Sequence, residues 1–269
     1  GVVKIYCNAQ HPDYETPWQF LPPTAQCGSA VYIGRRLLLT AAHVVSDHTF
    51  LQVQKVAEPN KRVARAVAVD DECDLALLEV NDADFVRGMT AARFATRVPQ
   101  LRDKVIVVGY PVGGEELALT EGVVSRYEAQ AYAHSQRRLL AISTDSAIND
   151  GSSGGPVYLD GHLVGIAFQG LEDVAANGHA VPVPIIKHFL KAFTERRVAR
   201  GFPALGVSTS ALINPALRRH TLIDAHPPLP STLAARQRRA AAAAAAAVRR
   251  RRQWCVAGGV ARAPPGGSS

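Results

Sequence analysis

Residues 150–156 read Asp-Gly-Ser-Ser-Gly-Gly-Pro, a pattern that sets a serine among glycines. A serine hydroxyl is a weak nucleophile at neutral pH, so it needs a base opposite it and hydrogen-bond donors for the oxyanion that develops. Glycines permit the tight turn that aims two N–H groups at one point, and they leave room for a substrate. The pattern therefore predicts Ser153 as a nucleophile, with the N–H groups of Gly151 and Ser153 as an oxyanion hole. For this stretch alone, a Gly/Ser loop between strands is an equally good interpretation.

Two residues upstream decide between these interpretations. His43 follows the apolar run 37–40 among small residues, which leaves room for an imidazole that faces a cleft, although most single histidines lie on the surface or in a core. Asp74 begins the apolar run 75–78; an acid there is usually a turn residue, but it can also orient an imidazole through Nδ1–H. The order His, Asp, Ser, at intervals of 31 and 79 residues, is that of chymotrypsin-type enzymes.

Short apolar runs at close spacing dominate the first 200 residues. Such spacing, without helical patterns between the runs, is typical of an all-β sandwich or barrel. One helix is predicted at 184–196, where apolar residues recur at helical spacing and Pro184 would lie in the first turn. The predicted strands are Val2–Cys7, Cys27–Ile33, Arg36–Thr40, Val63–Val69, Leu75–Val80, Val105–Val108, Leu117–Arg126, Leu139–Thr144, Pro156–Leu159 and His162–Phe168.

The basic charge of the chain belongs to its last part. The formal net charge is +7, from 30 lysines and arginines and 23 acidic residues. Eight arginines and no acidic residue follow Pro227, so residues 1–226 hold 22 basic and 23 acidic residues, and we expect them not to bind nucleic acid. Residues 227–269 are rich in Pro, Ala and Arg without a periodic apolar stripe, which predicts a disordered tail.

The cysteine and apolar patterns exclude other classes of protein. Four scattered cysteines, at 7, 27, 73 and 255, are too few for a disulfide framework or a zinc site. Reduced thiols are expected, with a Cys7–Cys27 bridge left open. No run of about 18 apolar residues occurs, so no membrane-spanning helix is expected. The chain begins at Gly1 rather than Met, which we interpret as a processed or trimmed start.

Six stretches together resemble the HtrA/Deg serine proteases, over about residues 1–220. The opening Val2–Cys7, with Pro17–Gln19, Gly165–Gln169 and Gly201–Pro203, resembles the plant and algal Deg branch more than the bacterial one. The six stretches are Thr40–Val45, Cys73–Leu78, Val108–Gly114, Thr120–Arg126, Asp145–Asn149 and Gly151–Pro156.

The resemblance implies a chymotrypsin-like double β-barrel with its site between the barrels, and neither a cofactor nor a metal. His43, Asp74 and Ser153 match the family triad, which implies a serine-type endopeptidase that cleaves unfolded or damaged polypeptides without ATP. The family's S1 wall corresponds to Ile148, Ile166 and Phe168, which implies a preference for small or aliphatic residues before the cut.

The resemblance also implies an assembly and a compartment. Members of the family associate as trimers through N-terminal segments of the protease. Tyr6, Trp18 and Phe20 are placed to fill such an interface, and packing within the chain is an equally good interpretation of each. Resemblance to the plant branch favours the chloroplast, whereas the basic block Arg249–Arg252 is the argument for the nucleus.

The chain departs from the family pattern at three places. Ser152 stands where Asn is usual and keeps a small polar side chain. Asp150 stands where Pro is common, and its charge would weaken an oxyanion hole unless the side chain points into solvent. Residues 201–226 resemble only the start of the PDZ domain that follows the protease in the family. We therefore expect a protease domain at 1–200, an incomplete PDZ region at 201–226, and a tail at 227–269 that is dispensable for the chemistry.

Two other interpretations stay open. A catalytically silent relative would bind polypeptides as a holdase, because disorder of residues 146–151 would stop catalysis without changing a catalytic residue. A protein associated with nucleic acid would bind through its arginine-rich tail, with a strong dependence on salt.

Overall fold

The structure is a computed structural model of the 269-residue chain, and it describes residues 1–56, 58–111, 116–146, 148–149, 151–170, 178–196, 201–203 and 212–221. The chain divides into two compact units, Gly1–Pro203 and Ala204–Ser269. In the second unit the described residues form one short helix, α2 (Pro215–His220). The side-chain oxygen of Asn214 caps the N-terminus of this helix. The predicted tail lies outside the described residues.

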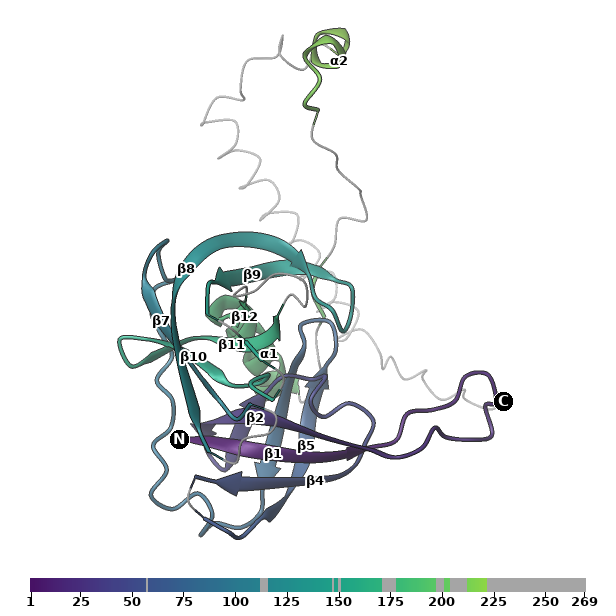
Figure 1. The fold of residues 1–269 in the computed structure, drawn as a ribbon, viewed down its shortest axis with the longest axis vertical. Helices are drawn as coiled ribbons and strands as arrows, with labels where there is room; N and C mark the ends of the chain where they lie inside the picture. The colour runs from purple at the N-terminus through teal and green to yellow at the C-terminus, as the bar shows by residue number, and fades with distance from the viewer. Residues whose placement is uncertain are drawn as a thin grey trace, which may run out of the picture. The chain divides into compact units, whose positions relative to one another are not determined.

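Two closed antiparallel barrels make up the first unit (Figure 1). The first barrel has the strand order β1-β2-β3-β6-β5-β4 and the second has the order β10-β11-β12-β9-β8-β7. This arrangement confirms the all-β double barrel expected from the sequence. The strands of the first barrel are β1 (Val2–Ala9), β2 (Thr24–Gly34), β3 (Leu37–Thr40), β4 (His48–Lys55), β5 (Arg62–Asp70) and β6 (Leu75–Val80). Those of the second are β7 (Lys104–Gly109), β8 (Ala118–Ala131), β9 (Arg138–Thr144), β10 (Pro156–Leu159), β11 (His162–Gly170) and β12 (Gly178–Pro182), after which comes the helix α1 (Val183–Arg196).

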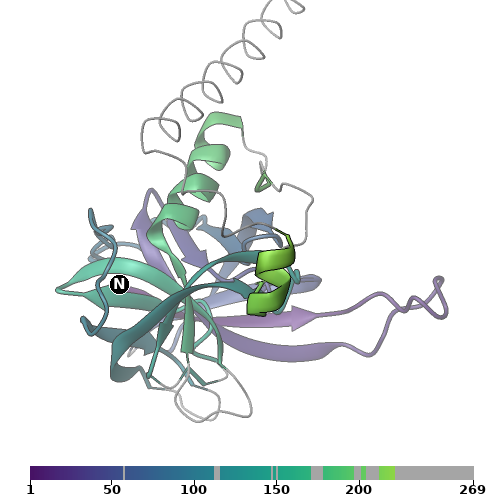
Figure 2. The same cartoon turned by 90° about the horizontal axis from the view of Figure 1, so that it is seen from above.

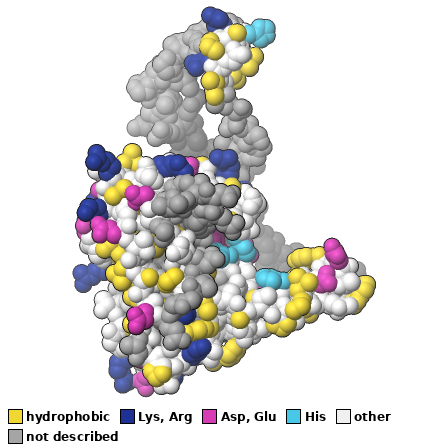
Figure 3. All heavy atoms as spheres, in the orientation of Figure 1, with side chains coloured by type: hydrophobic (Ala, Val, Ile, Leu, Met, Phe, Trp, Pro, Cys, Tyr) yellow, Lys and Arg dark blue, Asp and Glu magenta, His cyan; other side chains and the backbone are white. Residues whose placement is uncertain are grey.

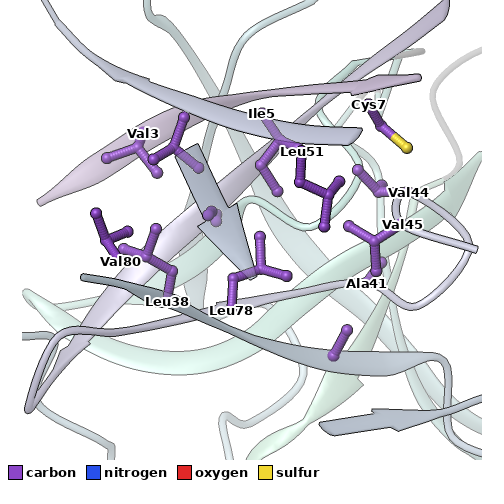
Figure 4. Close-up of a cluster of buried hydrophobic side chains, with 14 of the residues drawn as sticks. Val3, Ile5, Cys7, Leu38, Ala41, Val44, Val45, Leu51, Leu78 and Val80 are labelled. Carbon is purple, nitrogen blue, oxygen red and sulfur yellow. The ribbon is translucent and has the colours of Figure 1, made fainter. Parts of the chain in front are cut away.

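Alternating side chains fill the interior of the first barrel. Val3, Ile5 and Cys7 lie two residues apart on β1, so they share one face of the strand. They point inward and meet Leu51 of β4 and Leu78 of β6 (Figure 4). Burial of each large aliphatic side chain contributes about 1.5–3 kcal/mol. The apolar alternation of the sequence therefore supplies the side chains that fill the barrel.

A second core cluster spans both barrels and the helix. It joins Leu39 and Leu75 of the first barrel to Ile166 of the second barrel and Phe189 of α1. The helix begins at Val183, one residue before the predicted start, and buries its apolar stripe here. Since this cluster is shared, it holds the two barrels together.

The connection between β1 and β2 forms an arm that runs away from both barrels in two perpendicular views (Figures 1 and 2). Its aromatic side chains are exposed, with Tyr14 at 88%, Trp18 at 79% and Phe20 at 66%. The interpretation that Trp18 and Phe20 pack within the chain is therefore wrong, because the arm has no core of its own to cover them. Tyr6 lies instead on β1, where its hydroxyl donates to Gln54 Oε1 at 2.7 Å.

On the face of the first unit that Figure 3 shows, the basic and acidic side chains are interspersed rather than gathered by sign. Cys7, Cys27 and Cys73 are free thiols, so the Cys7–Cys27 bridge left open above does not form. Among the described residues, no helix is long and apolar enough to cross a membrane.

Candidate active site

The turn after β3 places His43, and the turn before β6 places Asp74. Asp74 is almost completely buried and has a left-handed backbone with φ 51°, a conformation that Asp adopts more readily than most residues. Its Oδ1 accepts a hydrogen bond from the backbone N–H of His43 at 2.8 Å, and its Oδ2 lies 2.7 Å from His43 Nδ1. With the proton on Nδ1, Nε2 of the imidazole is left as a base.

Ser153 lies in a turn with a left-handed glycine on either side. Gly151 has φ 85° and Gly154 has φ 81°, which L side chains rarely adopt. A Cβ on Gly154 would lie only 2.1 Å from Oγ1 of Thr40, at the end of β3. The turn that carries Ser153 is therefore pressed against the segment that leads into His43, three residues beyond Thr40.

The backbone N–H groups of this turn fall into two sets. Those of Ser152, Gly154 and Gly155 each donate to a backbone carbonyl, at 2.9, 2.7 and 3.0 Å. Those of Gly151 and Ser153 donate to no other group among the described residues. Backbone N–H groups without a partner among the described residues are available to stabilise an oxyanion.

A buried serine of the first barrel, Ser29 of β2, joins the first barrel to this turn. Its N–H donates to the carbonyl oxygen of Ser153 at 2.9 Å, and its hydroxyl donates to that of Gly151 at 2.8 Å. The same hydroxyl accepts from the N–H of Tyr110 at 2.8 Å, and Thr40 Oγ1 donates to the carbonyl oxygen of Ser29 at 2.7 Å. Ser29 is not among the site residues predicted from the sequence. The signal that could have found it is a polar residue at an interior position of an apolar strand.

The three residues assigned to S1 lie in two different core clusters. Ile148 packs with Ala167 in the core of the second barrel, and a Cβ on Gly178 would lie 2.5 Å from its Cγ1. Ile166 and Phe168 point to the opposite face of β11, into the cluster shared by both barrels. Since the described contacts do not bring the three together, the S1 assignment stays a prediction. Asp150 lies outside the described residues.

Two other ionisable side chains close to these residues are kept neutral by burial. Burial raises the pKa of the Cys73 thiol, which lies next to Asp74, so this cysteine stays protonated. Burial likewise raises the pKa of Tyr110 to about 12. The described part of the chain holds no group of three or more His, Cys, Asp or Glu residues that could bind a metal ion.

Comparison with known proteins identifies the family of the chain. The profile of the trypsin-like peptidase domain matches residues 28–166, which contain His43, Asp74 and Ser153. Protease Do-like 2, chloroplastic, of Arabidopsis thaliana is 42% identical over 221 residues, which are 81% of this chain and 36% of that protein. Protease Do-like 4, mitochondrial, of the same plant is 41% identical over 222 residues, or 82% and 42%.

The chain thus spans about two fifths of the length of these curated relatives. Among solved structures, the HtrA-type protease AlgW with a tripeptide has the same fold, with a TM-score of 0.64 at 23% identity. That match covers 81% of this chain and 67% of the other. From the matched domain and the identity to its plant relatives, the chain belongs to the trypsin-like peptidases, in the Do-like (HtrA/Deg) branch.

Proposed function

We propose that the chain is the peptidase domain of a serine endopeptidase, in which Ser153 is the nucleophile, His43 the general base and Asp74 the residue that orients His43. The observation that carries the proposal is the two-point hold of Asp74 on His43, through the backbone N–H and through Nδ1. A buried carboxylate on an imidazole fixes the tautomer and stabilises the imidazolium that forms in the reaction.

The chemistry follows from these positions. Ser153 Oγ attacks the carbonyl carbon of the scissile peptide, and its proton passes to Nε2 of His43. The negative charge on the carbonyl oxygen is stabilised by the N–H groups of Gly151 and Ser153. His43 then gives its proton to the leaving amine, which departs and leaves an acyl-enzyme on Ser153. Water, activated by His43, hydrolyses the ester and restores the hydroxyl.

The substrates that this proposal assigns are unfolded or damaged polypeptides, cleaved without ATP. The support comes from the relatives, which are named as Do-like proteases, and from the AlgW structure, which is described as holding a tripeptide. A role in protein quality control and a chloroplast location are part of the same proposal. Protease Do-like 2 is named as chloroplastic and Protease Do-like 4 as mitochondrial. A location in an organelle is therefore better supported than one in the nucleus.

Self-association is also part of the proposal, with trimers as the expected unit. The exposed aromatic side chains of the arm, Trp18 and Phe20, are its support, because large apolar groups in water favour a partner surface. The described residues of the first unit offer them no such surface.

The experiment that tests the proposal compares an unfolded with a folded substrate. We expect the protein to hydrolyse casein in ATP-free buffer and to leave a stably folded protein of similar size intact. Added ATP should change the cleavage rate of neither substrate. Ser153→Ala should bind casein and leave it intact. A wild-type protein that binds casein and leaves it whole would contradict the proposal and favour a holdase.

A further inference from the structure

A second imidazole, that of His134, lies beside the catalytic one. The connection between β8 and β9, residues 132–137 of the second barrel, brings His134 to the first barrel. The ring centres of His134 and His43 are 6.4 Å apart, and the planes are tilted by 54°. Nothing in the reaction described above uses this residue.

Two groups of the first barrel hold the His134 ring, both at Nε2. Ser46 Oγ lies 3.1 Å away and Asp71 Oδ1 lies 2.9 Å away. The Ser46 hydroxyl is directed to the carbonyl oxygen of Ala42, at 3.3 Å. Nε2 of His134 must then carry the proton, because both facing oxygens accept. The hydrogen bonds exist whether the ring is neutral or charged.

The two partners belong to the segments that carry the catalytic pair. Ser46 lies three residues after His43, in the same turn, and Asp71 lies three residues before Asp74. A neighbour of His134 adds to the link, since Ser135 Oγ donates to the carbonyl oxygen of Glu72 at 3.1 Å. The 132–137 connection therefore contacts both catalytic segments at once.

We propose that His134 is a positioning residue for the reaction proposed above, and that it fixes the turns of His43 and Asp74 against the second barrel, which carries Ser153. The site is divided between the barrels, so its geometry depends on their relative placement. Ser29 links the barrels at the Ser153 turn, and His134 links them at the His43 turn. A misplacement of about 1 Å costs on the order of 10²-fold in rate, so such links affect catalysis directly.

Three substitutions separate this role from general stability. His134→Leu removes the donor, and we expect kcat on a short peptide to fall about tenfold with KM changed less than about twofold. His134→Gln keeps an N–H donor for Asp71 and should recover kcat to within about threefold of wild type. His162→Leu is the matched control, because His162 is an exposed histidine at the β10–β11 turn that contacts the backbone of Asp160, and it should change nothing.

Coupling to Asp71 gives a further prediction. Asp71→Leu should lower kcat by about the same factor as His134→Leu, and the double variant should be no slower than either single one, because the two residues act as a unit. Additive losses in the double variant, a rise in KM alone, or unchanged kcat in His134→Leu would each overturn the inference.

A readout independent of turnover keeps this inference separate from the proposed function. The Nδ1 proton of His43, held by Asp74, should give a low-field ¹H NMR signal in the full-length wild type and in His134→Gln. In His134→Leu the signal should broaden through exchange with water. Failure of the proposed function appears as a wild-type protein that does not cleave peptides; failure of the inference appears as an unchanged signal in His134→Leu.

Discussion

The hydroxyl of Ser29 donates a hydrogen bond of 2.8 Å to the carbonyl oxygen of Gly151, and so ties a strand of the first barrel to the turn that carries Ser153. The Gly151 carbonyl belongs to the peptide that leads into Ser152, so this bond fixes the orientation of the turn. The same hydroxyl accepts from Tyr110 N–H, so its one donor and one of its two lone pairs are both used inside the protein. The turn of the proposed nucleophile is thus positioned by a residue that takes no chemical part.

Substitution of Ser29 by Ala should therefore affect both stability and rate. It leaves the Gly151 carbonyl and the Tyr110 N–H buried without their partner, at a cost of about 1–3 kcal/mol for each group. We expect kcat to fall about tenfold as the turn loses its support. Urea unfolding and steady-state kinetics measure the two effects. The control is Ser125→Ala, which removes a hydrogen bond from Ser125 in β8 to the carbonyl oxygen of Ser143 in β9 and should leave kcat unchanged. Equal kcat values for the Ser29 and Ser125 variants would contradict the account.

Substitution of Gly154 by Ala should prevent the native turn from forming. The new Cβ would overlap Thr40 Oγ1 at 2.1 Å and the Ser29 carbonyl oxygen at 2.2 Å, and the backbone has φ 81°. Gly161→Ala is a matched control, since Gly161 has φ 74° but open space around its Cβ. We expect a loss of about 1–2 kcal/mol from backbone strain in Gly161→Ala, and a clearly larger loss in Gly154→Ala. Similar midpoints of urea unfolding in the two variants would show that the turn is not pressed against β3.

Acid should destabilise the fold through His179 of β12. This imidazole is fully buried, and burial lowers its pKa below the ordinary value, although the nearby Glu128 opposes the effect. The folded state therefore holds the ring neutral, while the unfolded chain takes up a proton below about pH 6.5. Stability from this group is present above that pH and is lost as the pH falls toward the lowered folded value.

We expect the unfolding free energy to drop more between about pH 7.5 and pH 5.5 in wild type than in His179→Asn. Urea titrations at both pH values measure it. His162→Gln, at an exposed position, should keep the wild-type dependence. An identical pH dependence in His179→Asn would assign the acid lability to other groups.

Substrate selection should favour aliphatic or small apolar residues before the cut. Ile148 and Ile166 carry no charge, so a Lys or Glu side chain placed against them would lose its water without gaining a partner. Cleavage-site mapping by mass spectrometry on casein should show Val, Ile, Leu, Ala or similar residues at that position. A majority of Lys or Arg would show that Ile148 and Ile166 do not line the pocket.

The sequence predicts the local parts of this molecule well. Short alternating strands indicate the barrels, and the contexts of His43 and Asp74 indicate the pair that the structure holds at 2.7 Å. Each of these signals lies within a few residues of chain, where periodicity and turn chemistry operate. The arm is different, because an aromatic residue such as Trp18 suits a core or an interface equally well in sequence.

The contacts between the barrels could not be predicted in this way. Ser29 bonds to Gly151, 122 residues further along the chain, and His134 bonds to Asp71, 63 residues before it. Nothing in the local pattern around either residue specifies the distant partner, since both contacts arise only when two closed barrels pack together. The residues proposed to react could therefore be selected from the sequence, whereas Ser29 and His134, which support them, could be found only in the structure.

The most direct test of the central claim is to label the nucleophile. A phosphonofluoridate reagent should add once to the wild-type protein, and peptide mapping by mass spectrometry should place the adduct on Ser153. Ser152→Ala should be labelled and should keep most of its peptidase activity, whereas Ser153→Ala should take no label and lose at least about 10³-fold in kcat. An adduct on another residue, or a Ser153→Ala protein that still turns over peptide, would contradict the account.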